Sequence, residues 1–241
     1  MSGNASLTFV QETGSTNADM AAAIRGGDNP AEGHWHIALR QTAGRGRQGR
    51  EWFDGSGNFM GSTVVDLRAG DPPPATLPFI AALAVWQAIT DAVGDAADAK
   101  LKWPNDVLLN GGKVSGILLE LVGSCVVVGI GVNLSKAPDL TDRKTAALSD
   151  FVAVPGLEDF AASLAKHMTE FLKFWRNQDF ANVVDAFLAR SMHEIGAPIS
   201  VHDNGGDVVK GTFAGLEPTD GALRLRLADG SERVIRAGDI S

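Results

Sequence analysis

A short stretch of the chain, residues 41–52, places three arginines among three glycines. It reads Gln-Thr-Ala-Gly-Arg-Gly-Arg-Gln-Gly-Arg-Glu-Trp, with the arginines at Arg45, Arg47 and Arg50. Glycine lets a backbone approach a ligand closely, and arginine offers planar, bidentate donors to phosphate and carboxylate. The composition therefore predicts a loop that wraps an anion. Because the loop is too polar to bury a core of its own, we expect it to be mobile when empty and to close over its ligand.

Two other interpretations of this stretch stay open. Gly44, Gly46 and Gly49 fit the dinucleotide-binding pattern G-x-G-x-x-G, but that pattern requires a helix that opens on the loop. Residues 51–58 read as more loop, which disfavours a Rossmann site. A solvated basic loop without any ligand explains the stretch about equally well. Residues elsewhere in the chain are needed to choose among these interpretations.

Lysines and carboxylates occur in two further stretches. Residues 102–106, Lys-Trp-Pro-Asn-Asp, place a cation, an amide and a carboxylate where a proline interrupts a strand, so Asn105 and Asp106 are expected to project at a strand end. A plain turn has the same composition. Residues 112–116 set Lys113 on a strand between small residues. They are not a phosphate-binding P-loop, because Val107 stands where its first glycine should be.

Three weaker signals complete the set. Residues 15–17, Ser-Thr-Asn, suit a helix N-cap, or their hydroxyls face a ligand. Residues 116–120 end in the carboxylate of Glu120. Residues 129–133, Gly-Ile-Gly-Val-Asn, end a buried strand with an amide that can pair with the edge of an adenine or a sugar. Each signal is weak when it is taken alone.

In this order and spacing, the stretches together resemble the biotin protein ligases. The resemblance implies an α+β fold, in which a mixed-sheet catalytic domain is followed by a small SH3-like β-barrel. It implies an enzyme that uses ATP and Mg²⁺ to convert biotin to biotinyl-5′-adenylate. Biotin then passes to one lysine of a biotin carboxyl carrier protein or another carboxylase subunit.

The resemblance also implies a role for each matching residue. The expected catalytic residues are Lys113, Arg45, Arg47 and Asp106. The expected biotin contacts are Ser15, Thr16, Asn17, Gln41, Gly44, Arg45, Arg47, Lys113 and Gly116. The expected ATP contacts are Arg47, Arg50, Trp52, Lys102, Asn105, Lys113 and Asn133. No resident metal is expected. Gln48 and Glu51 stand where the family is often basic, so this loop is less cationic.

Three rival functions remain. A lipoate ligase or octanoyltransferase shares the fold, but its Arg-Arg-x-x-Gly-Gly-Gly pattern is absent, and Cys125, the only cysteine, lies in an apolar run with no histidine nearby in sequence. A biotin-responsive repressor carries a winged-helix domain before the catalytic domain. Because the Ser-Thr-Asn motif begins at residue 15, we expect no such domain, and a net charge of -8 does not favour DNA binding. The third rival is a structural domain with an inert loop.

The bulk composition is that of a soluble globular protein. Of the 241 residues, 44% are hydrophobic and 21% charged, and a single cysteine allows no intramolecular disulfide. We expect Cys125 to be buried and inert, and His34 and His36 to be strand residues rather than metal ligands. No secretion signal or membrane span is expected, which places the protein in the cytoplasm. Its oligomeric state is left open as a monomer or a weak homodimer.

Periodicity and turn residues predict the elements that position these stretches. We expect residues 1–194 to form the catalytic domain and residues 195–241 the small barrel, whose hairpins turn near residues 203–206, 218–221 and 229–230. The expected helices cover residues 16–25, 75–93, 157–175 and 180–189. The expected strands of the catalytic domain cover residues 7–10, 34–40, 58–67, 101–103, 107–109, 113–122 and 125–134.

Overall fold

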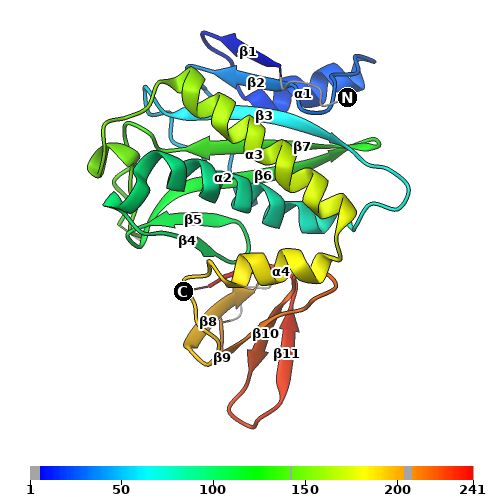
Figure 1. Ribbon diagram of the computed structural model, residues 1–241, viewed down its shortest axis with the longest axis vertical. Helices are drawn as coiled ribbons and strands as arrows, with labels where there is room; N and C mark the ends of the chain where they lie inside the picture. Colours follow the sequence, from blue (N-terminus) through cyan, green and yellow to red (C-terminus); the bar gives the residue numbers. More distant parts are fainter. Residues whose placement is uncertain (1–5, 142, 204–207, 241) are drawn as a thin grey trace.

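Seven strands of the computed structural model form one mixed sheet, in the order β1-β2-β3-β7-β6-β5-β4 (Figure 1). The structure describes residues 6–141, 143–203 and 208–240. Strands β1 and β2 are parallel, and every other neighbouring pair is antiparallel. The strands are β1 (Leu7–Val10), β2 (Trp35–Ala38), β3 (Phe59–Asp66), β4 (Ala99–Lys102), β5 (Asp106–Leu109), β6 (Gly112–Val122) and β7 (Cys125–Val132).

The register of the central strands gives the sheet two unlike faces. Ser62, Gly129 and Leu118 lie opposite one another on β3, β7 and β6. The next residues along β7 and β6, Ile130 and Ile117, are paired and belong to the buried core. Successive side chains of a strand point to opposite faces. One face is therefore packed with aliphatic side chains, whereas the other carries small residues that leave room above the sheet.

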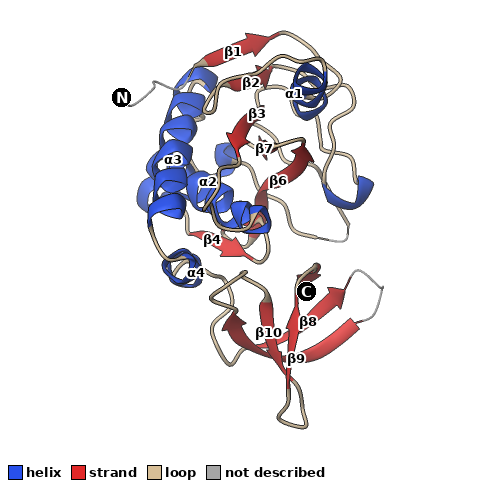
Figure 2. Ribbon diagram, turned by 90° about the vertical axis from the view of Figure 1, so that its right-hand side faces the viewer, coloured by secondary structure: helices blue, strands red, loops and turns tan. Residues whose placement is uncertain are grey.

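Helices cover the aliphatic face completely and the other face only in part. Helices α2 (Leu77–Val93) and α3 (Leu157–Asn177) lie together on one side, and α1 (Thr16–Arg25) lies on the other (Figure 2). Two side-chain contacts hold α3 in place. Trp175 Nε1 donates to Thr76 Oγ1 at 2.8 Å, and His167 Nε2 lies 2.7 Å from Asp91 Oδ2 on α2.

Helix α2 lies in a long run without charged residues. Residues 72–90 carry no charged side chain, and the helical segment 74–96 is long and apolar enough to cross a membrane by length and composition. In the structure this segment is the central core helix. Ile80, Leu83 and Ile89 are completely buried between α3 and the sheet. Burial within the molecule on nearly every side explains the composition.

A second, antiparallel sheet follows the helical layer. Its order is β11-β10-β9-β8-β12, and it is reached through α4 (Phe180–Leu188). Its strands are β8 (Pro198–Asp203), β9 (Val208–Leu216), β10 (Leu223–Arg226), β11 (Glu232–Ile235) and β12 (Gly238–Ile240). Trp103 of the catalytic sheet donates through Nε1 to the carbonyl oxygen of Gly221 at 3.0 Å. Apolar side chains of both sheets belong to one continuous core. The expected fold class is confirmed.

Most element boundaries agree with the sequence expectations within two residues. The turn at Asn110 and Gly111 has φ angles of 46° and 78°, as an Asn-Gly hairpin requires. Pro104 separates β4 from β5, as expected. The strand expected at 101–103 begins two residues earlier, at Ala99, because Ala99 pairs with Leu109 of β5. The turn expected near residues 203–206 lies largely outside the described residues.

An ion-pair network ties α3 to the edge of the sheet, and its loss should destabilise the fold. Arg176 donates to both carboxylate oxygens of Glu32 at 2.7 Å, and also to Asp71 at 3.2 Å. Glu32→Gln should lower the free energy of unfolding by about 1–3 kcal/mol, the range for hydrogen bonds to charged groups. Urea denaturation at neutral pH measures the change. Glu12→Gln, which breaks an exposed pair with Arg40, should cost at most about 1 kcal/mol.

The effect of Glu32→Gln should also depend on pH. Burial alone raises the pKa of Glu32, but the hydrogen bonds and charge of Arg176 outweigh it and lower that pKa below its ordinary value. A carboxyl with a lowered pKa contributes stability above the pKa of the unfolded state. That contribution is lost as pH falls through the folded pKa. The difference between wild type and Glu32→Gln should therefore shrink in acid, and a difference that grows in acid would contradict this account.

Candidate active site

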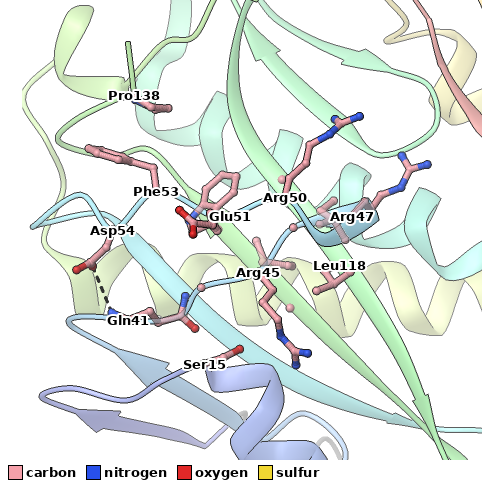
Figure 3. Close-up of a pocket in the computed structure, with 18 of the residues that line it drawn as sticks. Ser15, Gln41, Arg45, Arg47, Arg50, Glu51, Phe53, Asp54, Leu118 and Pro138 are labelled. Carbon is pink, nitrogen blue, oxygen red and sulfur yellow. Dashed lines mark hydrogen bonds between the residues drawn. The ribbon is translucent and has the colours of Figure 1, made fainter. Parts of the chain in front are cut away.

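A cavity of about 870 Å³ opens on the small-residue face of the sheet. It is lined by the glycine-arginine loop, the start of α1, strands β5, β6 and β7, the segment after β7, and one residue of β12 (Figure 3). Every residue that we expected at the site lines it, except Lys102. A volume of this order suits one drug-sized ligand or two joined small ones.

Uncharged polar groups form one end of the cavity. Gln41 Oε1 accepts hydrogen bonds from the backbone N–H of Thr16 at 2.7 Å and from its hydroxyl at 3.1 Å. The hydroxyl of Ser62 lies 2.7 Å from that of Thr16. Ser15 stands at the N-cap of α1, yet its side chain makes no capping hydrogen bond. Capping alone therefore does not account for Ser15, and its hydroxyl is available to a ligand.

Asn17 is fixed in orientation by its neighbours. Its amide nitrogen donates to Glu120 Oε2 at 2.8 Å, and its oxygen lies 2.6 Å from the hydroxyl of Ser62. A carboxylate only accepts hydrogen bonds, so the nitrogen of the amide must face Glu120. Gly129 lies directly beneath, where a Cβ atom would overlap the Asn17 amide. Only glycine at this position of β7 leaves room for Asn17.

The cationic groups of the loop point in two directions. Arg45 extends toward the α1 side, whereas Arg47 and Arg50 extend together to the opposite side (Figure 3). Arg45 lies 3.4 Å from Glu120, and Arg50 lies 2.9 Å from Asp239. The protein thus supplies its own carboxylates to the arginines of the loop.

The loop itself is held by backbone hydrogen bonds and by Trp52. The N–H of Gly46 donates to the carbonyl oxygen of Arg50 at 2.7 Å, and the N–H of Trp52 to that of Gly44 at 3.0 Å. The indole of Trp52 lies over Gly116 and Gly131. A Cβ atom on Gly116 would come within 2.7 Å of the ring, and one on Gly131 would overlap it. The missing side chain of Gly116, an expected biotin contact, makes space for this indole.

A lysine and a carboxylate meet beside the arginines. Lys113 Nζ lies 2.5 Å from Asp106 Oδ1, and both residues line the cavity. Asn105 next to Asp106 donates to the backbone of Ile117 at 2.7 Å and accepts from Arg47 at 2.7 Å. The break in the strand at Pro104 thus delivers an amide and a carboxylate to the site, as the sequence predicted.

One buried acceptor lacks a partner within the part of the chain that the structure describes. Asn133 lines the cavity and is 2% exposed. Its amide nitrogen donates to the carbonyl oxygen of Ala146 at 3.2 Å, but its Oδ1 atom has no hydrogen bond. A buried polar atom without a partner costs free energy, so such atoms mark places where a ligand supplies the missing group. A ligand with an N–H donor would therefore satisfy the Oδ1 atom of Asn133.

Lys102 is the one expected site residue that the structure places elsewhere. It pairs with Asp106 across the β4–β5 hairpin but does not line the cavity. Burial lowers the pKa of Lys102, although the charges of Asp106 and Asp239 act in the opposite direction. Its positive charge therefore partly balances the charge of these carboxylates. Sequence spacing could not separate it from Asp106, because both belong to one short motif.

Several residues of the site were not expected from the sequence. Some line the cavity next to predicted ones, namely Phe53, Asp54 and Leu118. Pro138 belongs to the segment after β7, and Asp239 comes from β12 at the far end of the chain. Proximity to Trp52 or to Gly116 could have pointed to the first three. No local pattern distinguishes Asp239 from the other surface carboxylates.

Two other sequence expectations concern metals and Cys125. Within residues 6–141, 143–203 and 208–240, no three histidine, cysteine or acidic side chains are grouped so that they could hold a metal ion. Cys125 is buried and lies apart from the cavity. Burial and a hydrogen bond to Asp66 raise the pKa of its thiol, which makes it a poor nucleophile. The expectation of a buried cysteine is confirmed.

The topology of the mixed sheet, the cationic loop, and a cavity with uncharged polar groups at one end and cations at the other are those of a ligase of the biotin and lipoate class. Residues 15–134 match the biotin/lipoate A/B protein ligase family, and residues 195–241 match the biotin protein ligase C terminal domain. The chain belongs to this family, and within it to the biotin protein ligases.

Two similar proteins of nearly the same length share the same name. The chain is 41% identical to a biotin–[acetyl-CoA-carboxylase] ligase of Paracoccus denitrificans, over 96% of this chain and 98% of that protein. It is 36% identical to a ligase of the same name from Mycobacterium tuberculosis, over 99% and 90%. A biotin protein ligase from Aquifex aeolicus, solved in complex with biotin and ATP, matches the structure with a TM-score of 0.84 at 25% identity, over 98% of this chain and 97% of that one.

Proposed function

We propose that this chain activates biotin with ATP to biotinyl-5′-adenylate and transfers biotin to one lysine of a biotin carboxyl carrier protein. One observation carries the proposal. A single cavity joins an uncharged end, at Thr16 and Gln41, to a cationic end, at Lys113, Arg47 and Arg50. Biotin has a neutral ureido ring at one end and a carboxylate at the other. The two ends of the cavity complement it in that order.

The uncharged end suits the ureido ring because it offers both donors and acceptors. The oxygen of the Gln41 amide is bound to Thr16. The nitrogen of the same amide therefore lies beside Gly44, where it can donate to a carbonyl of the ligand. The hydroxyl of Ser15 and the fixed amide of Asn17 supply further partners. A buried site built from such groups rejects ligands that cannot pair with them, at a cost of several orders of magnitude.

The cationic end suits the first chemical step. An oxygen of the biotin carboxylate attacks the α-phosphorus of ATP, and the bond to pyrophosphate breaks. Two anions must approach each other, and charge spreads over the phosphate oxygens in the transition state. Lys113, fixed by Asp106, and Arg47, fixed by Asn105, are placed to neutralise that charge. The Mg²⁺ ion enters with the phosphates as part of the substrate.

Asn133 suits the base of the nucleotide. Its unpaired Oδ1 atom can accept the exocyclic N–H of adenine. Asn133 therefore provides a physical reason for the use of ATP rather than a nucleotide with a carbonyl at that position. Trp52 and Arg50, which also line the cavity, would cover the nucleotide from the loop side.

The second step transfers the biotinyl group. The amine of the acceptor lysine attacks the carbonyl carbon of the mixed anhydride, the C–O bond breaks, and AMP leaves. The loop would keep water away from this reactive anhydride until the acceptor arrives. The enzyme is proposed to carry out both steps as a monomer or a weak homodimer. The need for ATP and for a carboxylase subunit places the reaction in the cytoplasm.

Lipoate is the alternative substrate, because the family match at residues 15–134 covers both classes. Lipoate lacks a ureido group, so it could not pair with the amide nitrogen of Gln41 or with the hydroxyl of Ser15. The test is pyrophosphate–ATP exchange, measured separately with biotin and with lipoate. We expect exchange with biotin and none above background with lipoate. Exchange with lipoate but not with biotin would overturn the proposal.

A further inference from the structure

One carboxylate from the end of the chain reaches the nucleotide side of the cavity. Asp239 lies on β12, the edge strand of the small sheet, and its side chain lines the same cavity as Lys113 and the loop arginines. It is 189 and 192 residues away in sequence from its two partners, Arg50 and Arg47. The small sheet thus contributes an anion to a site that must bind phosphates.

Asp239 holds both arginines that extend to this side of the loop. Arg50 donates to Asp239 Oδ2 at 2.9 Å, and Arg47 donates to Oδ1 at 3.4 Å. Each carboxylate oxygen therefore has its own guanidinium. Gln48 accepts a hydrogen bond from Arg50 at 2.7 Å, and Asn105 accepts one from Arg47 at 2.7 Å. Neutral groups orient the two arginines, and Asp239 supplies the negative charge between them.

The carboxylate is an anion at neutral pH. Burial opposes its ionisation, but the hydrogen bond from Arg50 and the charges of Arg47 and Arg50 lower the pKa of Asp239 below its usual value. Arginine pairs with carboxylate and with phosphate through the same planar donors. Asp239 therefore occupies the donors that a triphosphate needs.

We propose that Asp239 is an internal substitute for the phosphates of ATP, which holds Arg47 and Arg50 in the empty site and is displaced when the nucleotide binds. The inference rests on the proposed use of ATP at this cavity. Asp239 is a positioning residue, because it acts through the arginines and not on the reacting atoms. By this contact the small sheet sets the affinity of the site for the nucleotide.

Displacement is favoured by the exposure of the pair. The side chains of Asp239 and Arg50 are 38% and 44% exposed, and ion pairs at such exposure contribute little to stability. A triphosphate carries more charge than one carboxylate, and the two anions would repel each other if both lay beside the same arginines. The carboxylate must therefore release the arginines before phosphate can bind them, and the apparent affinity for ATP is reduced by the fraction of molecules in which the contact is made.

Glu232 provides a matched control within the same sheet. It also bridges two arginines, Arg224 at 2.7 Å and Arg226 at 2.8 Å, but it lies on β11 and does not line the cavity. Glu232→Gln removes a carboxylate from an equivalent arrangement without touching the site. An effect on the nucleotide that appears in Asp239→Asn and not in Glu232→Gln is then specific to the loop contact.

The test combines one measurement without substrates and one with them. In the free protein, trypsin should cut after Arg47 and Arg50 several-fold faster in Asp239→Asn than in wild type or Glu232→Gln. In biotin-dependent pyrophosphate exchange, the KM for ATP of Asp239→Asn should be about three- to tenfold lower, since each exposed pair contributes up to a few-fold. The KM for biotin should be unchanged.

Each result decides the proposal. Equal cleavage rates would show that Asp239 does not hold the loop, and an unchanged or raised KM for ATP would show that it does not compete with phosphate. Either outcome overturns the inference. If wild type showed no biotin-dependent exchange, the proposed function would fail instead. The cleavage rates, together with direct titration of MgATP into both variants, would still decide the role of Asp239.

Discussion

Lys113→Ala is expected to slow the formation of biotinyl-adenylate by about a hundredfold or more while the protein stays folded. Lys113 lines the cavity with its Nζ atom 2.5 Å from Asp106 Oδ1. Removal of one fixed group that stabilises developing charge typically costs about 3 kcal/mol in the transition state. Single-turnover formation of the adenylate, with biotin and ATP both saturating, measures the chemical step directly.

The control for this change is Lys144→Ala. Lys144 donates to the backbone of Asn110 at 2.9 Å and does not line the cavity. Its loss should leave the rate of adenylate formation within about twofold of wild type, and thermal unfolding of both variants reports on the fold. If Lys113→Ala kept a rate near that of wild type, Lys113 would lose its place among the catalytic residues.

Gly131→Ala is expected to weaken the binding of both substrates. A methyl group at this position overlaps the indole of Trp52, which lies flat on β7. The ring must move, and with it the loop that carries Arg45, Arg47 and Arg50. Overpacking of a tight contact costs about 1–3 kcal/mol, which corresponds to a loss of affinity of roughly five- to a hundredfold. The KM values of pyrophosphate exchange for biotin and for ATP give the measurement.

Gly14→Ala provides the comparison for this substitution. Gly14 stands just before the Ser-Thr-Asn motif, and a Cβ atom there meets nothing within 4 Å. It should leave both KM values unchanged. Gly131→Ala with unchanged KM values would mean that Trp52 can leave the floor of the cavity freely, and that its contact with β7 does not position the loop.

The sequence predicted well those parts of the site that depend only on residues close together in the chain. Residues 15–17 start a helix, and Pro104 lies between strands β4 and β5, so a capping residue and a proline define where the neighbouring side chains emerge. Periodicity likewise predicted the amphipathic helix α3. Contacts between distant segments could not be predicted in this way. Asp239 meets the loop only because the small sheet packs against the catalytic one.

Two features of the chain could not be decided from the sequence alone. Lys102 and Asp106 are four residues apart in one motif and pair with each other across the β4–β5 hairpin, yet Asp106 lines the cavity and Lys102 does not. Helix α2 has a composition that also suits a membrane, and only its burial between α3 and the sheet explains that composition. For α2, the deciding contacts come from elements that are distant in sequence.

The most direct test of the central claim is the transfer itself. The protein is incubated with biotin, MgATP and the biotin domain of a carboxylase subunit, and the mass of that domain is followed with time. We predict the addition of one biotinyl group to one lysine, with one AMP and one pyrophosphate released for each group transferred. Omission of ATP, or replacement of the acceptor lysine by arginine, should abolish the change. An acceptor that stays unmodified with biotin but gains a lipoyl group with lipoate would contradict the account.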